Sequence, residues 1–341
     1  MPLNVAVFST KRYDREFLVN ANVAAGHQLS FFDARLAEET LSLLTPVKDA
    51  PPFDAICAFV NDHLGKPVLE GLASRGVRVI ALRCAGFNNV NLRAAAHFNI
   101  PVLRVPAYSP NSVAEHALGL MLCLNRKLHR AYNRVREGNF ALDGLLGFDL
   151  SRRTIGVVGT GKIGEVFCKL VSGFGSRLLA YDIQPNPTCE ALGVHYVDLE
   201  TLFEESDVIN LHCPLNPHTH HMIDDAAIEK MRDGVMLINT SRGGLLDTQA
   251  VIRGLKNRRI GYLGLDVYEE EDDLFFEDLS GSVLQDDVFA RLLTFPNVVI
   301  TGHQAFFTEE ALANIAHTTI QNLTDFEQNG SSPNAVEWQE K

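Results

Sequence analysis

Four polar residues of this 341-residue chain each follow a short apolar run in its second half. They are His212 after "DVINL", Arg242 after "GVMLINTS", Asp266 after "IGYLGL" and His303 after "NVVITG". Arginine can hold a carboxylate through two parallel hydrogen bonds, and histidine exchanges protons near neutral pH. Ligands bind outside the carboxyl ends of the strands in an open parallel sheet, so we expect these side chains to share one crevice. They predict a site that binds a carboxylate and moves a proton.

If His303 carries the proton, we expect an acidic side chain beside it. A carboxylate beside His303 would stabilise the imidazolium, and the acidic run "EEEDD" at 269–273 offers five candidates, Glu271 among them. Most residues of such a run form a solvated face, and spacing does not choose among the five. The residues alone therefore leave the acidic partner open. They also leave open a surface role for Arg242 and a structural role for His303.

A glycine-spaced loop, "VVGTGKIG" at 157–164, lies near the middle of the chain. It follows the strand-like "RTIGVV" and precedes the helical pattern "EVFCKLVSGFG", which is the context of a dinucleotide-binding motif. Gly159 would permit the tight turn, Gly161 the approach of a pyrophosphate, and Gly164 close packing of helix on strand. Asp182, at the end of "RLLAY", would accept hydrogen bonds from a ribose diol and repel a 2′-phosphate. The motif predicts NAD as the cofactor in preference to NADP.

The segment "LHCPLNPHTHH" contains several histidines without the pattern of a metal site. His218, His220 and His221 have no carboxylate or cysteine partner at ligand spacing. We therefore expect no metal here. His212 and Cys213 are better explained as a wall against the cofactor.

The elements that must position these residues are short runs rich in Val, Ile and Leu that alternate with helical segments. This alternation predicts βα units and parallel sheets. One long helix over "YSPNSVAEHALGLMLCLNRKLHRAYNRV" separates two α/β domains, the first ending near residue 103 and the second spanning about 104–302. The predicted strands are 3–8, 54–60, 77–82, 154–158, 177–181, 207–212, 234–240, 260–266 and 297–301.

The composition limits the kinds of molecule that the protein is expected to bind. The formal net charge of −12 opposes binding to nucleic acid or to an acidic membrane surface. The chain opens directly into the strand-like "LNVAVF", without a leader pattern or an apolar run of membrane-spanning length. Six scattered cysteines form no CxxC pair, which indicates reduced thiols. We expect a cytoplasmic protein with a small-molecule ligand.

Taken together, the motifs resemble one enzyme family. "GTGKIG" with Asp182, "CPLNPHTHHMI", "NTSRGGLLD", "LGLDVYEEE" and "TGHQAFFTEEAL" occur in the order seen in the D-isomer-specific 2-hydroxyacid dehydrogenases. "LRCAGFNNVNL" and "VPAYSPNSVAEHALGL" resemble the substrate loop and the first interdomain helix of that family, so the likeness covers nearly the whole chain. Within the family it is similar to the NAD-dependent members that reduce pyruvate to D-lactate.

The resemblance implies roles by position. Arg242 would bind the substrate carboxylate, His303 would donate the proton, and Glu271 would be the acid paired with it. Ala85, Gly86, Tyr108 and Phe306, together with Arg242 and His303, would surround the substrate. The motif and the resemblance together assign the NAD site to Gly159, Gly161, Lys162, Ile163, Gly164, Asp182, His212, Cys213, Pro214, Thr219, Thr240, Ser241, Arg242 and Asp266.

The resemblance also implies an architecture. A flavodoxin-like substrate domain, residues 1–103 plus 303–341, would face a Rossmann cofactor domain, residues 104–302, across a cleft. Both would be doubly wound parallel sheets, and the chain would form a homodimer or homotetramer. Two other functions stay open: a different 2-oxoacid substrate, and an NAD(H)-sensing protein like the related transcriptional corepressors. The absence of an extended disordered or basic region in the sequence favours the enzyme.

Overall fold

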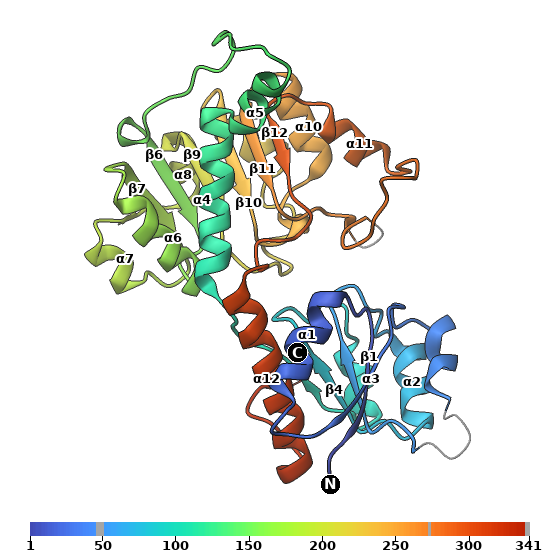
Figure 1. Cartoon of the computed structure of the whole chain (residues 1–341). Helices are drawn as coiled ribbons and strands as arrows, with labels where there is room; N and C mark the ends of the chain where they lie inside the picture. Colours follow the sequence, from blue (N-terminus) through green and yellow to red (C-terminus); the bar gives the residue numbers. More distant parts are fainter. Residues whose placement is uncertain (46–50, 272–273, 338–341) are drawn as a thin grey trace. The chain divides into compact units, whose positions relative to one another are not determined.

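The computed structural model describes residues 1–45, 51–271 and 274–337. These form two compact units (Figure 1). The N-terminal unit comprises Met1–Ser109 and the chain from Phe307 onward, and the central unit is Pro110–Phe306. Within the described ranges, no helix has both the length and the apolar character that a membrane crossing requires.

The central unit contains a seven-stranded sheet in the order β12-β11-β10-β9-β6-β7-β8, and every neighbouring pair is parallel. The chain starts in the middle at β6, runs outward to β8, and then returns to β9 on the other side of β6. This reversal is the switch point at which doubly wound sheets bind ligands. The strands are β6 (Thr154–Val158), β7 (Arg177–Tyr181), β8 (His195–Tyr196), β9 (Val208–Leu211), β10 (Val235–Asn239), β11 (Ile260–Leu265) and β12 (Val298–Ile300).

Helices cover both faces of this sheet, because its strands are buried and apolar on both sides. Helices α4 and α6 pack on one face over a core that includes Leu120, Phe167 and Ile238. Helices α8 to α11 pack on the other, over a core that includes Leu202 and Leu263. The helices are α4 (Pro110–Arg126), α5 (Leu128–Arg136), α6 (Lys162–Ser172), α7 (Pro187–Ala191), α8 (Leu199–Glu205), α9 (Asp225–Lys230), α10 (Thr248–Lys256) and α11 (Asp287–Leu293), with short 3-10 turns η2 (Leu150–Arg152) and η3 (Gly243–Leu245).

The N-terminal unit has a six-stranded sheet in the order β13-β5-β4-β3-β1-β2. All its neighbours are parallel except β13, which pairs antiparallel with β5. Helices α1 and α12 pack on one face, and α2, α3 and η1 on the other. The elements are β1 (Asn4–Val7), α1 (Arg12–Ala21), β2 (Gln28–Phe31), η1 (Glu39–Leu44), β3 (Ala55–Ala58), α2 (Lys66–Ser74), β4 (Val79–Leu82), α3 (Leu92–His97), β5 (Val102–Leu103), α12 (Glu309–Asn329) and β13 (Ala335–Val336).

The prediction of two doubly wound α/β units with parallel sheets is confirmed. All nine predicted runs form strands, whereas β2, β5, β8 and β13 were not predicted. Three of these four strands have only two residues, which leaves no alternating or apolar pattern to read. The six cysteines are free thiols.

The unit boundaries lie a few residues later than the predicted ones after residues 103 and 302. Hydrogen bonds explain the shift. The Val105 N–H donates to the Cys84 carbonyl at 3.1 Å, which holds the linker to the N-terminal unit. The His303 N–H donates to the Asp266 carbonyl at 2.7 Å, which holds the end of β12 and the following loop to the central unit.

The expected single helix over 108–135 is wrong, since it is two helices. The chain breaks at Lys127, whose φ of 50° and ψ of 40° are left-handed and cannot continue an α-helix. The buried Asn125 side chain exchanges two 2.9 Å hydrogen bonds with the Phe148 backbone, and the Lys127 ammonium donates to the Leu146 carbonyl. A returning segment therefore captures the end of α4, and that contact is not encoded in the helical pattern.

Candidate active site

The predicted polar residues follow neighbouring parallel strands of the central unit. The glycine loop follows β6, Asp182 follows β7, and His212 follows β9. Arg242 comes after β10, and Asp266 follows β11 directly. Because all seven strands run in the same direction, these segments lie along one edge of the sheet, the carboxyl edge. The glycine loop and His212 flank the switch point itself.

Each of the three glycines in the loop is required or permitted for a different physical reason. Gly159 has φ +95°, and a Cβ there would lie 2.7 Å from the Cys213 nitrogen, so no other residue fits. A Cβ on Gly164 would lie 2.0 Å from the Gly159 carbonyl oxygen, so helix and loop could not pack as they do. A Cβ on Gly161 would meet nothing within 4 Å. The first and third glycines serve the protein's own packing, and the second leaves open space in front of α6.

Asp182 lies at the end of β7, partly exposed, and is bound to the glycine loop. One carboxylate oxygen accepts from the Thr160 N–H at 2.6 Å and from the Thr160 hydroxyl at 3.1 Å. The other accepts from the Gln184 N–H at 3.1 Å. The Tyr196 hydroxyl also donates to the Thr160 hydroxyl, at 2.8 Å. These bonds fix the carboxylate and the loop as one unit, which sequence reasoning did not anticipate.

His212 and Cys213 form a wall beneath the loop. Burial lowers the pKa of His212 to about 4, so its ring is neutral at physiological pH. The ring packs on Phe167 with centroids 5.0 Å apart, and its buried Nε2 has no hydrogen-bond partner within the described part of the chain. Burial also raises the pKa of the Cys213 thiol to about 11. Neither residue can act as a charged group here.

The other residues predicted for this wall lie close by. The Ser241 hydroxyl donates to the Cys213 carbonyl at 2.7 Å, and the Thr219 hydroxyl donates to the Pro214 carbonyl at 2.7 Å. Thr240 is buried at the end of β10. The Ser241 bond joins the segments after β9 and β10, and the Thr219 bond holds the segment after β9 in shape.

Arg242 lies in a loop in which the next residue, Gly243, must be glycine. A Cβ on Gly243 would lie 2.1 Å from the Tyr268 carbonyl, so the backbone after Arg242 passes directly against the segment after β11. The Asn239 side chain donates to the Arg242 carbonyl at 2.8 Å, and the guanidinium donates to the Ser241 carbonyl at 2.7 Å. The side chain is partly exposed at the carboxyl edge. The remaining guanidinium donors can serve a bound anion.

His303 and Glu271 form the predicted pair. His303 Nδ1 lies 2.8 Å from Glu271 Oε1, and the side chains are only 15% and 17% exposed. The Tyr268 N–H donates to Glu271 Oε2 at 2.9 Å, which fixes the carboxylate. The Phe276 ring lies 5.6 Å from the imidazole. With Nδ1 facing Glu271, the other ring nitrogen, Nε2, is the one that can exchange a proton with a ligand.

Of the other acids in the run 269–273, Glu269 contacts His221 instead, Glu270 is exposed, and Asp272 and Asp273 lie outside the described residues. Spacing could not have made this distinction. The family resemblance named Glu271, and the geometry puts it against His303.

Asp266 is fully buried, and its carboxylate organises the loop that carries His303. One oxygen accepts from the Thr301 hydroxyl at 2.5 Å, from the Gln304 N–H at 2.9 Å and from His116 Nε2 at 3.3 Å. The other oxygen accepts from the Ala305 N–H at 2.8 Å. Burial by itself would raise the pKa of Asp266, but the hydrogen bonds outweigh it and lower the pKa.

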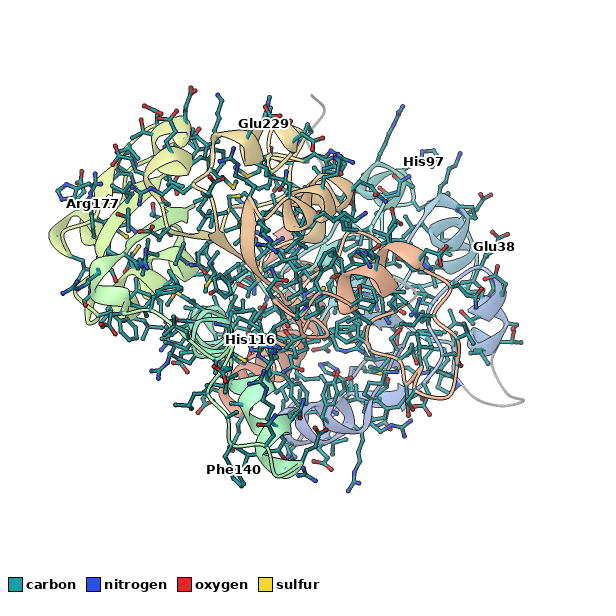
Figure 2. The ribbon with its side chains drawn as sticks, turned by 90° about the horizontal axis from the view of Figure 1, so that it is seen from above. Glu38, His97, His116, Phe140, Arg177 and Glu229 are labelled. Atoms are coloured by element: carbon teal, nitrogen blue, oxygen red, sulfur yellow. The ribbon has the colours of Figure 1, made fainter. Side chains whose placement is uncertain are left out.

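Sequence reasoning assigned Asp266 to the NAD site and missed two of its partners, His116 and Thr301. His116, labelled in Figure 2, belongs to α4, which lies far from Asp266 in the chain. His303 has φ +54°, a conformation uncommon outside glycine, so these contacts hold a backbone that would otherwise relax. The carboxylate's observed partners are therefore structural, and its role toward NAD stays a prediction.

The residues predicted to contact substrate are divided between the two units. Phe306 is buried in the central unit. Ala85, Gly86 and Tyr108 lie in the N-terminal unit, where Ala85 and Gly86 follow β4. The Arg104 guanidinium donates to the Ala85 carbonyl at 3.1 Å and supports that loop.

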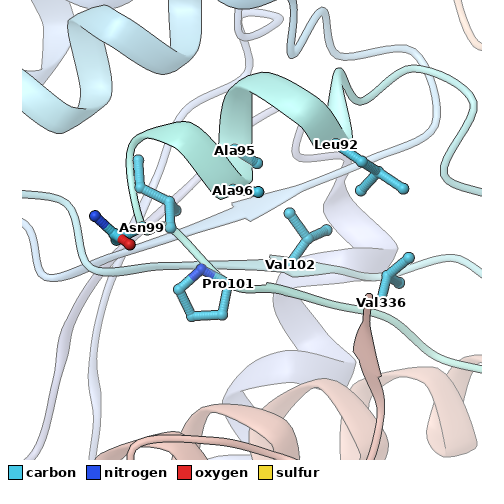
Figure 3. A pocket seen from close by; sticks show the side chains of 8 residues that line it. Leu92, Ala95, Ala96, Asn99, Pro101, Val102 and Val336 are labelled. Carbon is cyan, nitrogen blue, oxygen red and sulfur yellow. The ribbon is translucent and has the colours of Figure 1, made fainter. Parts of the chain in front are cut away.

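Two surface pockets of the N-terminal unit lack the chemistry expected of a hydride-transfer site. A pocket of about 330 Å³ is mostly apolar, with α3 on one side and β5 on the other (Figure 3). A second pocket, of about 460 Å³, lies on the opposite side of α3. The first is lined by Leu92, Ala95, Ala96, Asn99, Ile100, Pro101, Val102 and Val336, and the second by Lys66, Asn91, Arg93, Ala94 and His97. Neither contains a predicted site residue; those of the central unit gather instead at the carboxyl edge of its sheet.

Comparison with known proteins agrees with this geometry. The family model described as D-isomer specific 2-hydroxyacid dehydrogenase, NAD binding domain, matches residues 118–305. A D-lactate dehydrogenase of Escherichia coli K12 is 54% identical over 334 residues, which cover 98% of this chain and 100% of that relative. The chain belongs to the D-isomer-specific 2-hydroxyacid dehydrogenases. The family resemblance seen in the sequence is confirmed.

Solved structures support the same assignment of fold. The apo-structure of D-lactate dehydrogenase from Escherichia coli has a TM-score of 0.88 at 50% identity and covers 98% of this chain and 100% of its own. The D-lactate dehydrogenase of Aquifex aeolicus, complexed with NAD and lactic acid, has a TM-score of 0.82 at 34% identity, covering 95% and 96%. This 2-hydroxyacid dehydrogenase is an enzyme whose cofactor is NAD.

The central unit fits that cofactor. The open space at Gly161 lies where a pyrophosphate would approach, and α6 begins there without a side-chain cap. Uncapped N–H groups at a helix N-terminus attract phosphate. The unpartnered Nε2 of His212 is a further polar atom that lacks a partner within the described residues.

Proposed function

We propose that the chain is an NAD-dependent D-lactate dehydrogenase that reduces pyruvate to D-lactate. The single observation that supports pyruvate as the substrate is the 54% identity, over 98% of the chain, to a relative named D-lactate dehydrogenase. The candidate site supports the reaction class, because the central unit offers both a cation for a carboxylate and a carboxylate–histidine pair.

Arg242 binds the carboxylate of pyruvate through guanidinium donors other than the one that bonds the Ser241 carbonyl. A bidentate contact of this kind fixes the orientation of the substrate as well as its position. The two glycines that follow Arg242 keep the neighbouring backbone free of side chains. Arg242 therefore determines which way the carbonyl group faces.

His303 holds the proton that the carbonyl oxygen receives. Its Nδ1 lies against Glu271 Oε1 at 2.8 Å, so the proton on Nε2 is directed to the substrate. Glu271 orients the imidazole through Nδ1, and the Tyr268 N–H holds the carboxylate in place. The hydride that reduces the carbonyl carbon would come from NADH when that cofactor is bound. In the reverse direction, neutral His303 accepts the proton of the D-lactate hydroxyl.

His303→Ala tests this assignment. A positioned general acid contributes roughly 10²- to 10⁴-fold, so we expect kcat for pyruvate reduction to fall at least 100-fold. Titration of NADH by fluorescence should give an unchanged dissociation constant. Glu271→Gln should also lower kcat, because an amide replaces the carboxylate that holds His303 Nδ1 at 2.8 Å. Undiminished turnover in His303→Ala would contradict the proposed proton path.

We infer that the protein acts in the cytoplasm as a homodimer or homotetramer. Helix α5 and the segment after it expose large apolar side chains, including Tyr132 at 61%, Phe140 at 74% and Leu146 at 85%. Phe140 is labelled in Figure 2. Such a patch is typical of an interface between copies. Light scattering of the purified protein tests this, and Phe140→Ser with Leu146→Ser should shift the mass toward the monomer.

A further inference from the structure

Three metal-ligating side chains meet outside the proposed catalytic machinery. His220 and His221 lie in the loop between β9 and α9, and Glu269 lies four residues after β11. One ligand atom of each residue lies within 4.8 Å of the other two. His221 Nε2 is 2.5 Å from Glu269 Oε1, and the two imidazole rings stack with centroids 3.9 Å apart.

The surrounding backbone holds two of the three in place. His221 has φ +51°, which is uncommon for a residue other than glycine, and its N–H donates to the Gly244 carbonyl at 2.9 Å. Glu269 Oε2 accepts from the Thr248 hydroxyl at 2.9 Å. One oxygen of the carboxylate is therefore anchored and the other is directed at His221, as in carboxylates that ligate metals.

We propose that His220, His221 and Glu269 bind one divalent transition-metal ion of the zinc type. Two imidazoles and one carboxylate form a known zinc ligand set, in which water takes the fourth tetrahedral position. Mg²⁺ and Ca²⁺ are disfavoured because they select oxygen ligands. His220 is exposed, so its ring can turn from stacking on His221 to share the ion. The ion takes the place of the proton between His221 and Glu269.

The expectation of no metal site rested on the lack of a carboxylate at ligand spacing around these histidines. The fold removes that reason, since Glu269 reaches His221 from the segment after β11. A hydrogen bond alone would involve only His221 and Glu269. His220 is the residue that a metal site needs and a hydrogen bond does not.

Zinc titration of the full-length protein, without a histidine tag and stripped with a chelator, tests the inference by calorimetry. We expect one Zn²⁺ per chain, with affinity reduced at least ten-fold in His220→Ala. His218→Ala is the matched control in the same exposed loop, and its affinity should equal that of the wild type. Co²⁺ should give the intense visible absorption of a tetrahedral site, and His220→Ala should lose it.

Absence of a one-to-one Zn²⁺ complex would overturn the inference, as would equal affinities of His220→Ala and the wild type. A loss in His218→Ala as large as that in His220→Ala would also overturn it, because the ligands would then lie elsewhere in the loop. Glu269→Gln should weaken binding too. If that variant fails to fold, His220→Ala still decides, since His220 is exposed. Pyruvate reduction without added metal should be unchanged in His220→Ala, so failure here is distinct from failure of the proposed function.

Discussion

Asp266→Asn perturbs the buried carboxylate that organises the His303 loop. Asparagine keeps the shape but replaces one oxygen with an NH₂ group. If the amide oxygen keeps the contacts with Thr301 and Gln304, the NH₂ group faces the Ala305 N–H, and two donors oppose each other. Leaving a buried donor unsatisfied costs about 1–3 kcal/mol, and the charge-assisted bonds weaken as well.

We therefore expect the free energy of unfolding of the central unit to fall by about 2–4 kcal/mol. For a unit of this size each kcal/mol corresponds to a Tm change of roughly 2–4 °C. Because His303 sits in the loosened loop, kcat should fall at least ten-fold, since small displacements of catalytic groups are costly. Urea unfolding followed by circular dichroism and steady-state NADH oxidation measure the two effects.

The pH dependence has a defined sign. The folded pKa of Asp266 is lowered, so the carboxylate adds stability above its unfolded pKa and loses it as pH falls through the folded pKa. Below about pH 4 the wild type should lose stability faster than Asp266→Asn, whose side chain does not titrate. Asp198→Asn is the matched control for stability at neutral pH, because an exposed N-cap accepts either residue with little change in stability. An Asp266→Asn protein with wild-type stability and kcat would refute the reasoning.

Three further substitutions follow from the structure. Gly159→Ala places a Cβ 2.7 Å from the Cys213 nitrogen at φ +95°, so NADH affinity in a fluorescence titration should drop at least ten-fold; an unchanged affinity would contradict the tight turn. Arg83→Leu leaves the buried Asp14 without its 3.2 Å partner and should cost about 3–5 kcal/mol in urea unfolding, whereas a neutral result would show that the pair is dispensable. Asp182→Ala should raise kcat/KM with NADPH relative to NADH, and an unaltered ratio would argue against its role in cofactor choice.

Local sequence patterns were enough to predict most of the strands and the fold class. Runs such as "RTIGVV" and "GVMLIN" are apolar over their whole length and predict buried parallel strands without knowledge of their neighbours. The break at Lys127 could not be predicted in this way, because it depends on Leu146 and Phe148 returning to the end of α4. Tertiary contact there overrides a good helical pattern.

The residues of the candidate site also differ in whether local sequence predicts them. Residue type and position after a strand were enough to select Arg242 and His303, since parallel strands bring their carboxyl ends to one edge. The choice of Glu271 needed the family resemblance, because five acids in a row have no distinguishing spacing. His116 and Asp266 are in contact although they lie near opposite ends of the central unit's sequence. No local pattern predicts such a contact.

The most direct test of the proposed function is a panel of 2-oxoacids assayed with NADH and the purified protein, followed by NAD reduction with D-lactate and L-lactate separately. We expect the highest kcat/KM for pyruvate and reduction of NAD by D-lactate alone. A strong preference for a bulkier or aromatic 2-oxoacid would contradict the proposed substrate while leaving the proton path intact. Absence of turnover on every 2-oxoacid, with NADH still bound, would contradict the enzyme assignment and favour an NAD(H)-sensing protein.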